Sequence, residues 1–118
     1  MNDHTIEQEI QAKALTAPRV TLADIEDNID SEWYFNAGDA VIPDGFQPPV
    51  PALSPLYLLT LCVLILKNGF TVTGESACVS LENFDADLGR KIARQNAVQK
   101  IWPLMGYALK ERLSEVSA

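Results

Sequence analysis

Residues 60–76 carry the sequence TLCVLILKNGFTVTGES, which predicts a β-hairpin. The first part, from Thr60 to Leu66, is rich in valine, isoleucine and leucine, as buried strands are. The pair Asn68-Gly69 is a strong hairpin signal, because both central residues of a type I′ turn need positive φ angles. Residues 70–76 then alternate in polarity, as a half-buried strand does.

A two-residue turn at Asn68-Gly69 fixes which side chains share a face of the hairpin, because side chains alternate along a strand. The predicted core face holds two pairs across the turn and one aromatic residue: Ile65 with Val72, Val63 with Gly74, and Phe70. The opposite face is predicted to mix apolar and polar partners, in the pairs Leu66–Thr71, Leu64–Thr73 and Cys62–Glu75.

Leu64 and Leu66 make this second face unusual, since a solvated sheet face would not normally carry two leucines. Either the first strand is central and covered on both sides, or the face is a contact surface. A two-stranded hairpin alone is only marginally stable. We therefore expect a further strand, supplied by this chain's loop or by another subunit.

The segment after the hairpin predicts a long helix that begins near Asn83, a favoured N-cap residue. Asp85 and Asp87 lie in its first turns, where the helix dipole favours negative charge. Asp87 precedes Lys91 by four residues, the spacing of a favourable ion pair. The expected buried stripe is Phe84, Leu88 and Ile92, continued by Ala93, Ala97 and Ile101.

Pro103 is expected to break or kink this helix after Trp102, because proline cannot donate the backbone hydrogen bond of a helix interior. Proline is also favoured as the first residue of a helix. A second helix from Leu104 to about Leu113 is therefore compatible with the sequence.

The first half of the chain predicts another helix followed by a long loop. Thr21 and Asp24 have the spacing of a capping box. Apolar residues then follow at helical spacing and predict a helix from Leu22 to Phe35, with the stripe Leu22, Ile25, Ile29 and Trp33. Five prolines between residues 43 and 55 exclude a regular helix or a central strand. Residues 36–55 are expected to be a proline-rich connecting loop, with a docking motif as the alternative.

These elements predict a small α+β domain: helix, proline-rich loop, β-hairpin, and a long C-terminal helix kinked at Trp102-Pro103. The domain is expected to span residues 19–118. Residues 1–18 form an N-terminal segment with the composition of a frayed helix.

Charge is distributed unevenly along the chain. Residues 1–50 carry two basic and ten acidic side chains, a net charge of −8, whereas residues 51–118 carry a net charge of +1. The acidic half argues against direct nucleic-acid binding, because phosphate contacts need a basic surface. It permits a basic partner or mimicry of nucleic acid, and a solvated, solubilising surface is the simpler interpretation.

Composition also limits location and cofactors. The longest apolar run, from Leu56 to Leu66, is shorter than the roughly 20 residues that span a bilayer, so no membrane span is expected. The N-terminus lacks the features of a signal peptide, which predicts a cytoplasmic protein. Cys62 and Cys78 are then expected to be reduced thiols. With His4 as the sole histidine, we expect no metal site and no cofactor.

No catalytic constellation is recognisable, so the sequence predicts no catalytic residue and no enzyme. Two features are candidates for binding. The first is the polar strip of the return strand: Thr71, Thr73, Glu75 and Ser76. The second is the basic side of the long helix, at Arg90, Lys91 and Arg94, although pairing with the chain's own acidic half is the favoured interpretation there.

The run from Leu66 to Val79, with Asn83-Phe84-Asp85, Leu88 to Ala93 and Lys100 to Leu104, resembles the phage gene-49/gene-66 family. The likeness extends from about Val20 to Leu113 and is weakest in the proline-rich loop. Met105 stands where the family is expected to have glutamate, and Leu81 where it is expected to have proline. The resemblance implies an accessory protein made in an infected or lysogenic bacterium, and no catalytic residue or cofactor.

The leading hypothesis is a non-enzymatic accessory protein that binds a host protein, as a homo-oligomer joined through the hairpin at Leu64 and Leu66. The second hypothesis is capture of a small anionic ligand, such as a nucleotide immune signal. It uses Arg90, Arg94 and the polar strip, with Tyr107 for stacking. The third is DNA mimicry by the acidic helix from Leu22 to Phe35.

Overall fold

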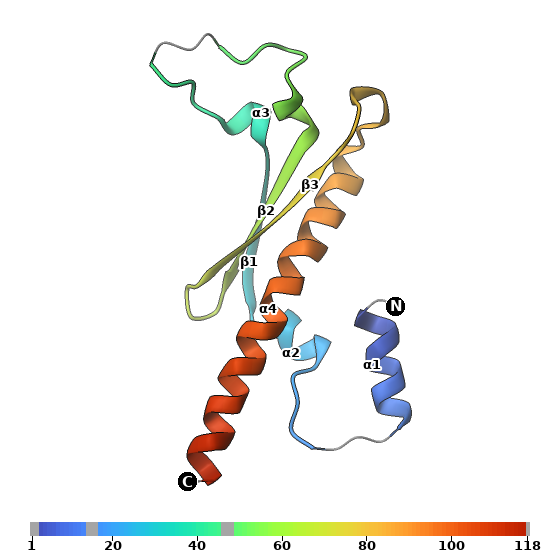
Figure 1. The fold of residues 1–118 in the computed structure, drawn as a ribbon, viewed down its shortest axis with the longest axis vertical. Helices are drawn as coiled ribbons and strands as arrows, with labels where there is room; N and C mark the ends of the chain where they lie inside the picture. The colour runs from blue at the N-terminus through green and yellow to red at the C-terminus, as the bar shows by residue number, and fades with distance from the viewer. Residues whose placement is uncertain (1–2, 14–16, 46–48, 118) are drawn as a thin grey trace.

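The computed structural model describes residues 3–13, 17–45 and 49–117 and shows a three-stranded antiparallel sheet beside one long helix (Figure 1). The strands are β1 (Ile29–Asn36), β2 (Leu59–Leu66) and β3 (Thr71–Ala77), in the spatial order β1-β2-β3. The helical elements are α1 (Asp3–Ala12), α2 (Leu22–Asp27), α3 (Ala37–Ala40), η1 (Pro55–Leu58), η2 (Leu81–Asn83) and α4 (Ala86–Ser117). The predicted α+β class, with a hairpin followed by a long helix, is confirmed.

The hairpin turn contains three residues rather than two. The Gly69 amide donates to the Leu66 carbonyl at 2.8 Å, and the Leu66 amide donates to the Phe70 carbonyl at 2.9 Å. Gly69 has a φ of 89°, which fits the three-residue hairpin loop with glycine in the left-handed region. The side-chain oxygen of Asn68 also accepts from the Phe70 amide at 2.9 Å. The two-residue turn predicted at Asn68-Gly69 is therefore wrong.

The longer turn shifts the strand register by one residue and exchanges the two predicted faces of β2, whereas Val72 and Gly74 of β3 are buried on the core side as predicted. Leu64 pairs with Val72, and Cys62 pairs with Gly74. These side chains, with Leu66, lie in the core; Leu64 is 0% exposed and Leu66 is 4% exposed. The prediction that Leu64 and Leu66 form a contact surface is wrong, and so is the core face predicted at Val63 and Ile65.

The predicted helix from Leu22 to Phe35 is corrected to a short helix and a strand. The capping box at Thr21 and Asp24 is confirmed, with hydrogen bonds of 2.9 and 3.1 Å. However, α2 ends at Asp27, and β1 then pairs antiparallel with β2. Pairing with β2 explains the difference. Only two residues of the helical stripe, Ile29 and Trp33, lie in β1, and the hydrogen bonds to β2 override this weak helical signal. This third strand comes from the chain itself and makes β2 the central strand.

Helix α4 begins three residues later than predicted. Asp85 is its cap: the Asp85 carboxylate accepts from the Leu88 amide at 3.1 Å, and the Asp85 carbonyl accepts from the Gly89 amide at 2.9 Å. The predicted ion pair between Asp87 and Lys91 is confirmed at 3.2 Å. Asn83, the predicted cap, lies instead in η2.

The buried side of α4 carries smaller side chains than predicted. Ala93, Ala97 and Ile101 are buried as expected. Leu88 and Ile92, which the prediction placed in the same stripe, are 53% and 40% exposed. Small residues replace them on the buried side, because the helix lies so close to the sheet that larger side chains would not fit.

The chain stays helical through Pro103, so the predicted second helix is the last part of α4 rather than a separate element. The proline leaves the carbonyl of Gln99 without its helical donor. Beyond the sheet, α4 continues to the C-terminus as the lower end of the molecule in Figure 1.

The molecule is elongated for its length. Its principal extents are 59 × 31 × 18 Å and its radius of gyration is 18.5 Å, against about 13.5 Å for a compact domain of this size. Its accessible surface is 8349 Å², against about 6,300 Å² for an average monomer of this mass. The isolated chain thus exposes roughly 2,000 Å² more than a compact protein would.

The contact between Gly74 of β3 and α4 should be sensitive to a single methyl group. A Cβ at Gly74 would lie 2.9 Å from the Cα of Ala97 and closer still to backbone atoms of Ala93 and Ala97. Gly74→Ala is expected to lower the free energy of unfolding by about 3 kcal/mol, because the helix must move away from the sheet.

Gly106→Ala is the matched control. Gly106 lies inside α4, and nothing lies within 4 Å of an added Cβ. This change is expected to raise the free energy of unfolding by about 1 kcal/mol through helix propensity. Urea denaturation measures both, and equal effects of the two variants would contradict the proposed packing.

Candidate functional site

The face of the sheet turned away from α4 is the candidate functional site, and we call it the uncovered face. Strand pairing places its residues in three rows across the sheet. The rows are Ser31–Ile65–Thr71, Trp33–Val63–Thr73 and Phe35–Leu61–Glu75. Each row therefore runs from β1 through an apolar residue of β2 to a polar residue of β3.

Two aromatic side chains of β1 dominate the uncovered face. Trp33 is 60% exposed and Phe35 is 40% exposed. The Trp33 indole nitrogen donates to the hydroxyl oxygen of Ser31 at 3.0 Å, which holds the ring near its own strand. The adjacent Leu61, Val63 and Ile65 are only half-buried. Together these side chains make an apolar surface of the kind that marks interaction sites.

The uncovered face stays open because the helices that pack on the sheet lie on its other side. The core joins Cys62, Leu64 and Leu66 of β2 to Ala93, Ala97 and Ile101 of α4, with Ile25 of α2. In Figure 1, α4 runs alongside β3, and it packs against β3 and β2. Within residues 3–13, 17–45 and 49–117, no helix or strand packs over Trp33.

The polar residues of β3 form the margin of this surface. Thr71, Thr73 and Glu75 are exposed, and Glu75 is the ionisable group among the nine residues of the uncovered face. A surface with one carboxylate among its nine residues suits binding rather than proton transfer. Exposed aromatic and aliphatic side chains with a polar margin on one side are the composition of a protein interface.

On the covered side of the sheet, Arg94 joins three elements. Its guanidinium, on α4, donates to Glu26 of α2 at 2.7 and 3.1 Å and to Glu32 of β1 at 2.6 Å. The hydrogen bonds that Arg94 donates to Glu26 lower the pKa of Glu26 below its usual value, and the same bonds raise the pKa of Arg94. The predicted pairing of the basic side of the long helix with the acidic first half is therefore seen for Arg94, whereas Arg90 and Lys91 pair with Asp87 of α4 itself.

The predicted anion-binding residues do not converge on one site. Thr71, Thr73 and Glu75 lie on the uncovered face, whereas Arg94 lies on the covered side and is compensated by two carboxylates. Arg90 lies 3.8 Å from Asp87. Ser76 lines a small cavity of about 120 Å³ beside Cys78 and Phe84, and Tyr107 is 71% exposed on the far part of α4.

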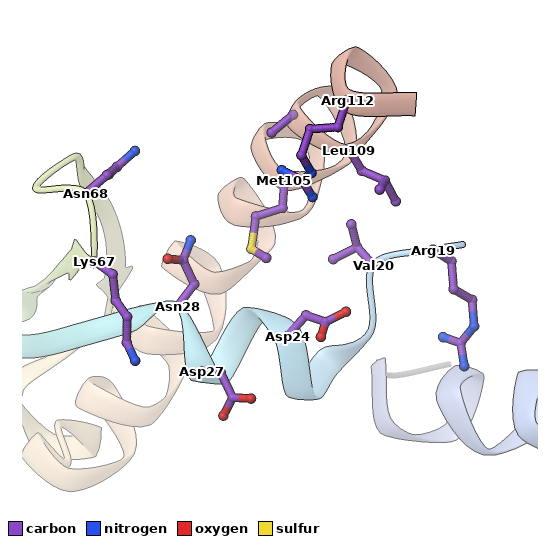
Figure 2. Close-up of a pocket in the computed structure, with 11 residues that line it drawn as sticks. Arg19, Val20, Asp24, Asp27, Asn28, Lys67, Asn68, Met105, Leu109 and Arg112 are labelled. Atoms are coloured by element: carbon purple, nitrogen blue, oxygen red, sulfur yellow. The ribbon is translucent and has the colours of Figure 1, made fainter. Parts of the chain in front are cut away.

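A cleft of about 550 Å³ lies where α4 passes α2 and the hairpin turn (Figure 2). Its apolar part is made by Val20, Met105 and Leu109, which lie together in the view. Its charged lining is mixed and comprises Arg19, Asp24, Asp27, Lys67 and Arg112. Arg19 is already paired with Glu7 at 2.9 Å. Because both signs of charge line the cleft, it does not favour a small anion.

The cysteines have structural surroundings. Cys62 is buried in the core, and this burial raises the pKa of its thiol, which keeps the thiol protonated and unreactive. Cys78 is a free thiol that donates to the Ser80 carbonyl at 3.1 Å. Among the residues that the structure describes, no cluster of histidine, cysteine or acidic side chains could hold a metal ion. No helix in that part of the chain is long and apolar enough to cross a bilayer.

Trp33 and Phe35 are the site residues that the sequence reasoning missed. The prediction placed them in a helix, with Trp33 on its buried side. The signal that could have identified them is the sequence Trp33-Tyr34-Phe35, three consecutive aromatic residues, because aromatic residues are enriched in strands.

Comparison with known proteins identifies a family. The model of the Phage protein (N4 Gp49/phage Sf6 gene 66) family matches residues 20–113, which include the whole sheet and most of α4. The search of curated proteins and the search of solved structures each gave no match.

The Arg94 cluster should make stability depend on pH in a defined direction. Because Arg94 lowers the pKa of Glu26 in the folded state, its stabilisation is present above the usual pKa of 4.5 and is lost as the pH falls through the folded-state value. Arg94→Met is expected to cost about 1 kcal/mol at neutral pH, since the cluster is partly exposed. The difference from wild type should shrink as the pH falls below 4.5 and through the lowered pKa of Glu26.

Urea denaturation of both proteins across this pH range measures the effect. Lys91→Met is the control, because Lys91 pairs with Asp87 at the exposed start of the helix and should cost less than about 0.5 kcal/mol. A destabilisation by Arg94→Met that persists undiminished in acid would contradict the assignment.

Proposed function

Because the chain belongs to the N4 Gp49/phage Sf6 gene 66 family of phage proteins, we propose that it is a non-enzymatic phage accessory protein that binds a host protein through the uncovered face of its sheet. The observation that carries this proposal is the exposure of Trp33 beside Phe35 on an uncovered, half-apolar sheet. Exposed tryptophan is among the residues most often found as energetic hot spots in protein interfaces.

The size of the exposed surface supports a protein partner rather than a small ligand. A standard protein interface buries about 800 Å² on each partner. The chain exposes roughly 2,000 Å² more than a compact monomer of its mass, which accommodates such an interface. The uncovered face spans all three strands and is a sheet surface rather than a deep pocket, which suits a protein surface better than a small molecule.

Charge favours a foreign partner over a second copy at this face. The chain carries a net charge of −7, and residues 1–50 carry −8. Glu75 is the carboxylate on the uncovered face. Two copies stacked face to face would bring two such carboxylates and two acidic chains together, whereas a partner with a basic margin would complement them.

Two alternatives from the sequence lose their structural basis. Small-anion capture required Arg94 and the polar strip to meet, and they lie on opposite sides of the sheet. DNA mimicry required a helix from Leu22 to Phe35, and half of that segment is strand β1.

Affinity capture from host lysate with the tagged full chain tests the proposal. We expect a protein that is enriched by wild type and by Ile42→Ala, a change at a 91% exposed apolar residue of the long loop. The same protein should be lost with Trp33→Ala. With the purified target, Trp33→Ala should raise the dissociation constant by about 30-fold or more, which corresponds to a hot spot of about 2 kcal/mol.

Thr73→Arg serves as a second variant, because it adds a positive charge in the same row as Trp33 without removing a large side chain. It should also abolish capture. Enrichment of the same proteins by wild type, Trp33→Ala and Thr73→Arg would contradict binding through the uncovered face.

A further inference from the structure

The last part of α4, residues 104–117, extends beyond the sheet, and we call it the arm. Between Gly89 and Ile101, α4 packs on the sheet, and Ile101 is the last buried residue among those described. From Leu104 onwards the side chains are half-buried or exposed. Figure 1 shows the arm continuing past the hairpin turn, with no strand beside its C-terminal end.

The arm has a poor sequence for a solitary helix. Pro103 immediately precedes it and removes one backbone hydrogen bond. Gly106, within it, costs about 1 kcal/mol relative to alanine. The arm continues a helix that packs on the sheet, so it carries no separate nucleation cost, but both Pro103 and Gly106 weaken it. Packing against another surface would stabilise it.

An apolar stripe marks the side of the arm that such a surface would cover. Met105, Leu109, Leu113 and Val116 follow one another at helical spacing. Met105 packs against the core and Leu109 is half-buried, whereas Leu113 is 36% and Val116 is 85% exposed. The stripe thus starts at the core and runs out along the exposed arm.

The cleft of Figure 2 opens along this stripe. Met105 and Leu109 form its side on α4, and Asp24 and Asp27 of α2 and Lys67 of the hairpin turn lie around it. Among the ion pairs of the described residues, Lys67 and Arg112 have none. The cleft therefore offers an apolar floor with charges of both signs at its rim.

The arm itself matches these charges. It carries Lys110 and Arg112 against Glu111 and Glu115, so it is neutral although the whole chain has a net charge of −7. Two arms can approach without net repulsion, unlike the acidic first halves of two chains. The bases of one arm suit Asp24 and Asp27 of another chain, and its acids suit Lys67.

We propose that two copies of this chain form a two-fold dimer in which each arm packs, antiparallel, against the arm and cleft of the other copy. A two-fold interface makes every contact twice, so a pair between Asp27 and Arg112 of the second copy recurs in reverse. The dimer buries the stripe from Met105 to Val116 and leaves the uncovered face of each sheet free. It stands independently of the proposed host binding.

Sedimentation velocity over a range of micromolar concentrations tests the proposal on the full chain. Wild type is expected to sediment as a dimer of the 13.0 kDa chain. The double variant Leu109→Asp, Val116→Asp should be monomeric, because it places charges in the apolar stripe. The control Leu53→Asp, at a 79% exposed residue outside the arm, should remain dimeric.

A charge-reversal pair tests the geometry and does not disturb the core, since Asp27 and Arg112 are both exposed. Asp27→Lys and Arg112→Glu should each raise the dissociation constant of the dimer by about tenfold. Combining them should restore it to within about threefold of wild type, because the pair is re-formed with the signs exchanged.

A wild-type chain that is monomeric at all these concentrations would overturn the inference. So would a dimer that survives the arm variants and is dissociated by Thr73→Arg, because that dimer would use the uncovered face. The monomeric arm variant should still capture the host protein, so failure of the arm dimer and failure of the sheet-face interface are distinguishable.

Discussion

The close contact between α4 and β3 at Gly74 is the constraint on which the rest of this structure depends. With no side chain at Gly74, and with alanine at positions 93 and 97, the backbones of helix and strand approach to within contact of each other. Gly89 lies similarly close to the side chain of Thr60. A helix held by such small residues covers one face of the sheet tightly. The bulkier apolar residues of β1, Trp33 and Phe35, lie on the other face of the sheet.

This packing separates structural from interacting surfaces. On the covered side, Arg94 pairs with Glu26 and Glu32 and so ties α2 and β1 to α4. The acidic residues of the first half therefore have a structural role at these two positions. On the other side, the sheet presents aromatic and threonine side chains without a covering layer. The arm of α4 leaves the sheet altogether, so the surface proposed for a second copy is separate from the one proposed for a host protein.

Local sequence signals predicted the elements whose causes are local. The capping box at Thr21 and the ion pair at Asp87 depend on residues three or four apart. The hairpin was predicted for the same reason. Its register was not, because Asn68-Gly69 fits both a two-residue turn and a three-residue turn. The extra turn residue changes which face of β2 is buried, so the prediction placed Leu64 and Leu66 on the surface although they lie in the core.

Strand β1 could not be predicted from its own residues, because its partner lies far along the chain. Ile29 and Trp33 continue a helical stripe from Leu22, and only pairing with β2 selects the extended form. The same dependence on a distant partner limited the prediction of the candidate site. Thr71, Thr73 and Glu75 were identified from the return strand, whereas Trp33 and Phe35 joined them only through β1.

The exposure of Trp33 is the most direct test of this account. The chain has two tryptophans, and Trp102→Phe leaves Trp33 as the sole one. The account predicts that its fluorescence maximum matches that of indole in water, and that acrylamide quenches it nearly as well as free tryptophan. A blue-shifted maximum with little quenching, in a folded protein free of partners, would contradict the uncovered face.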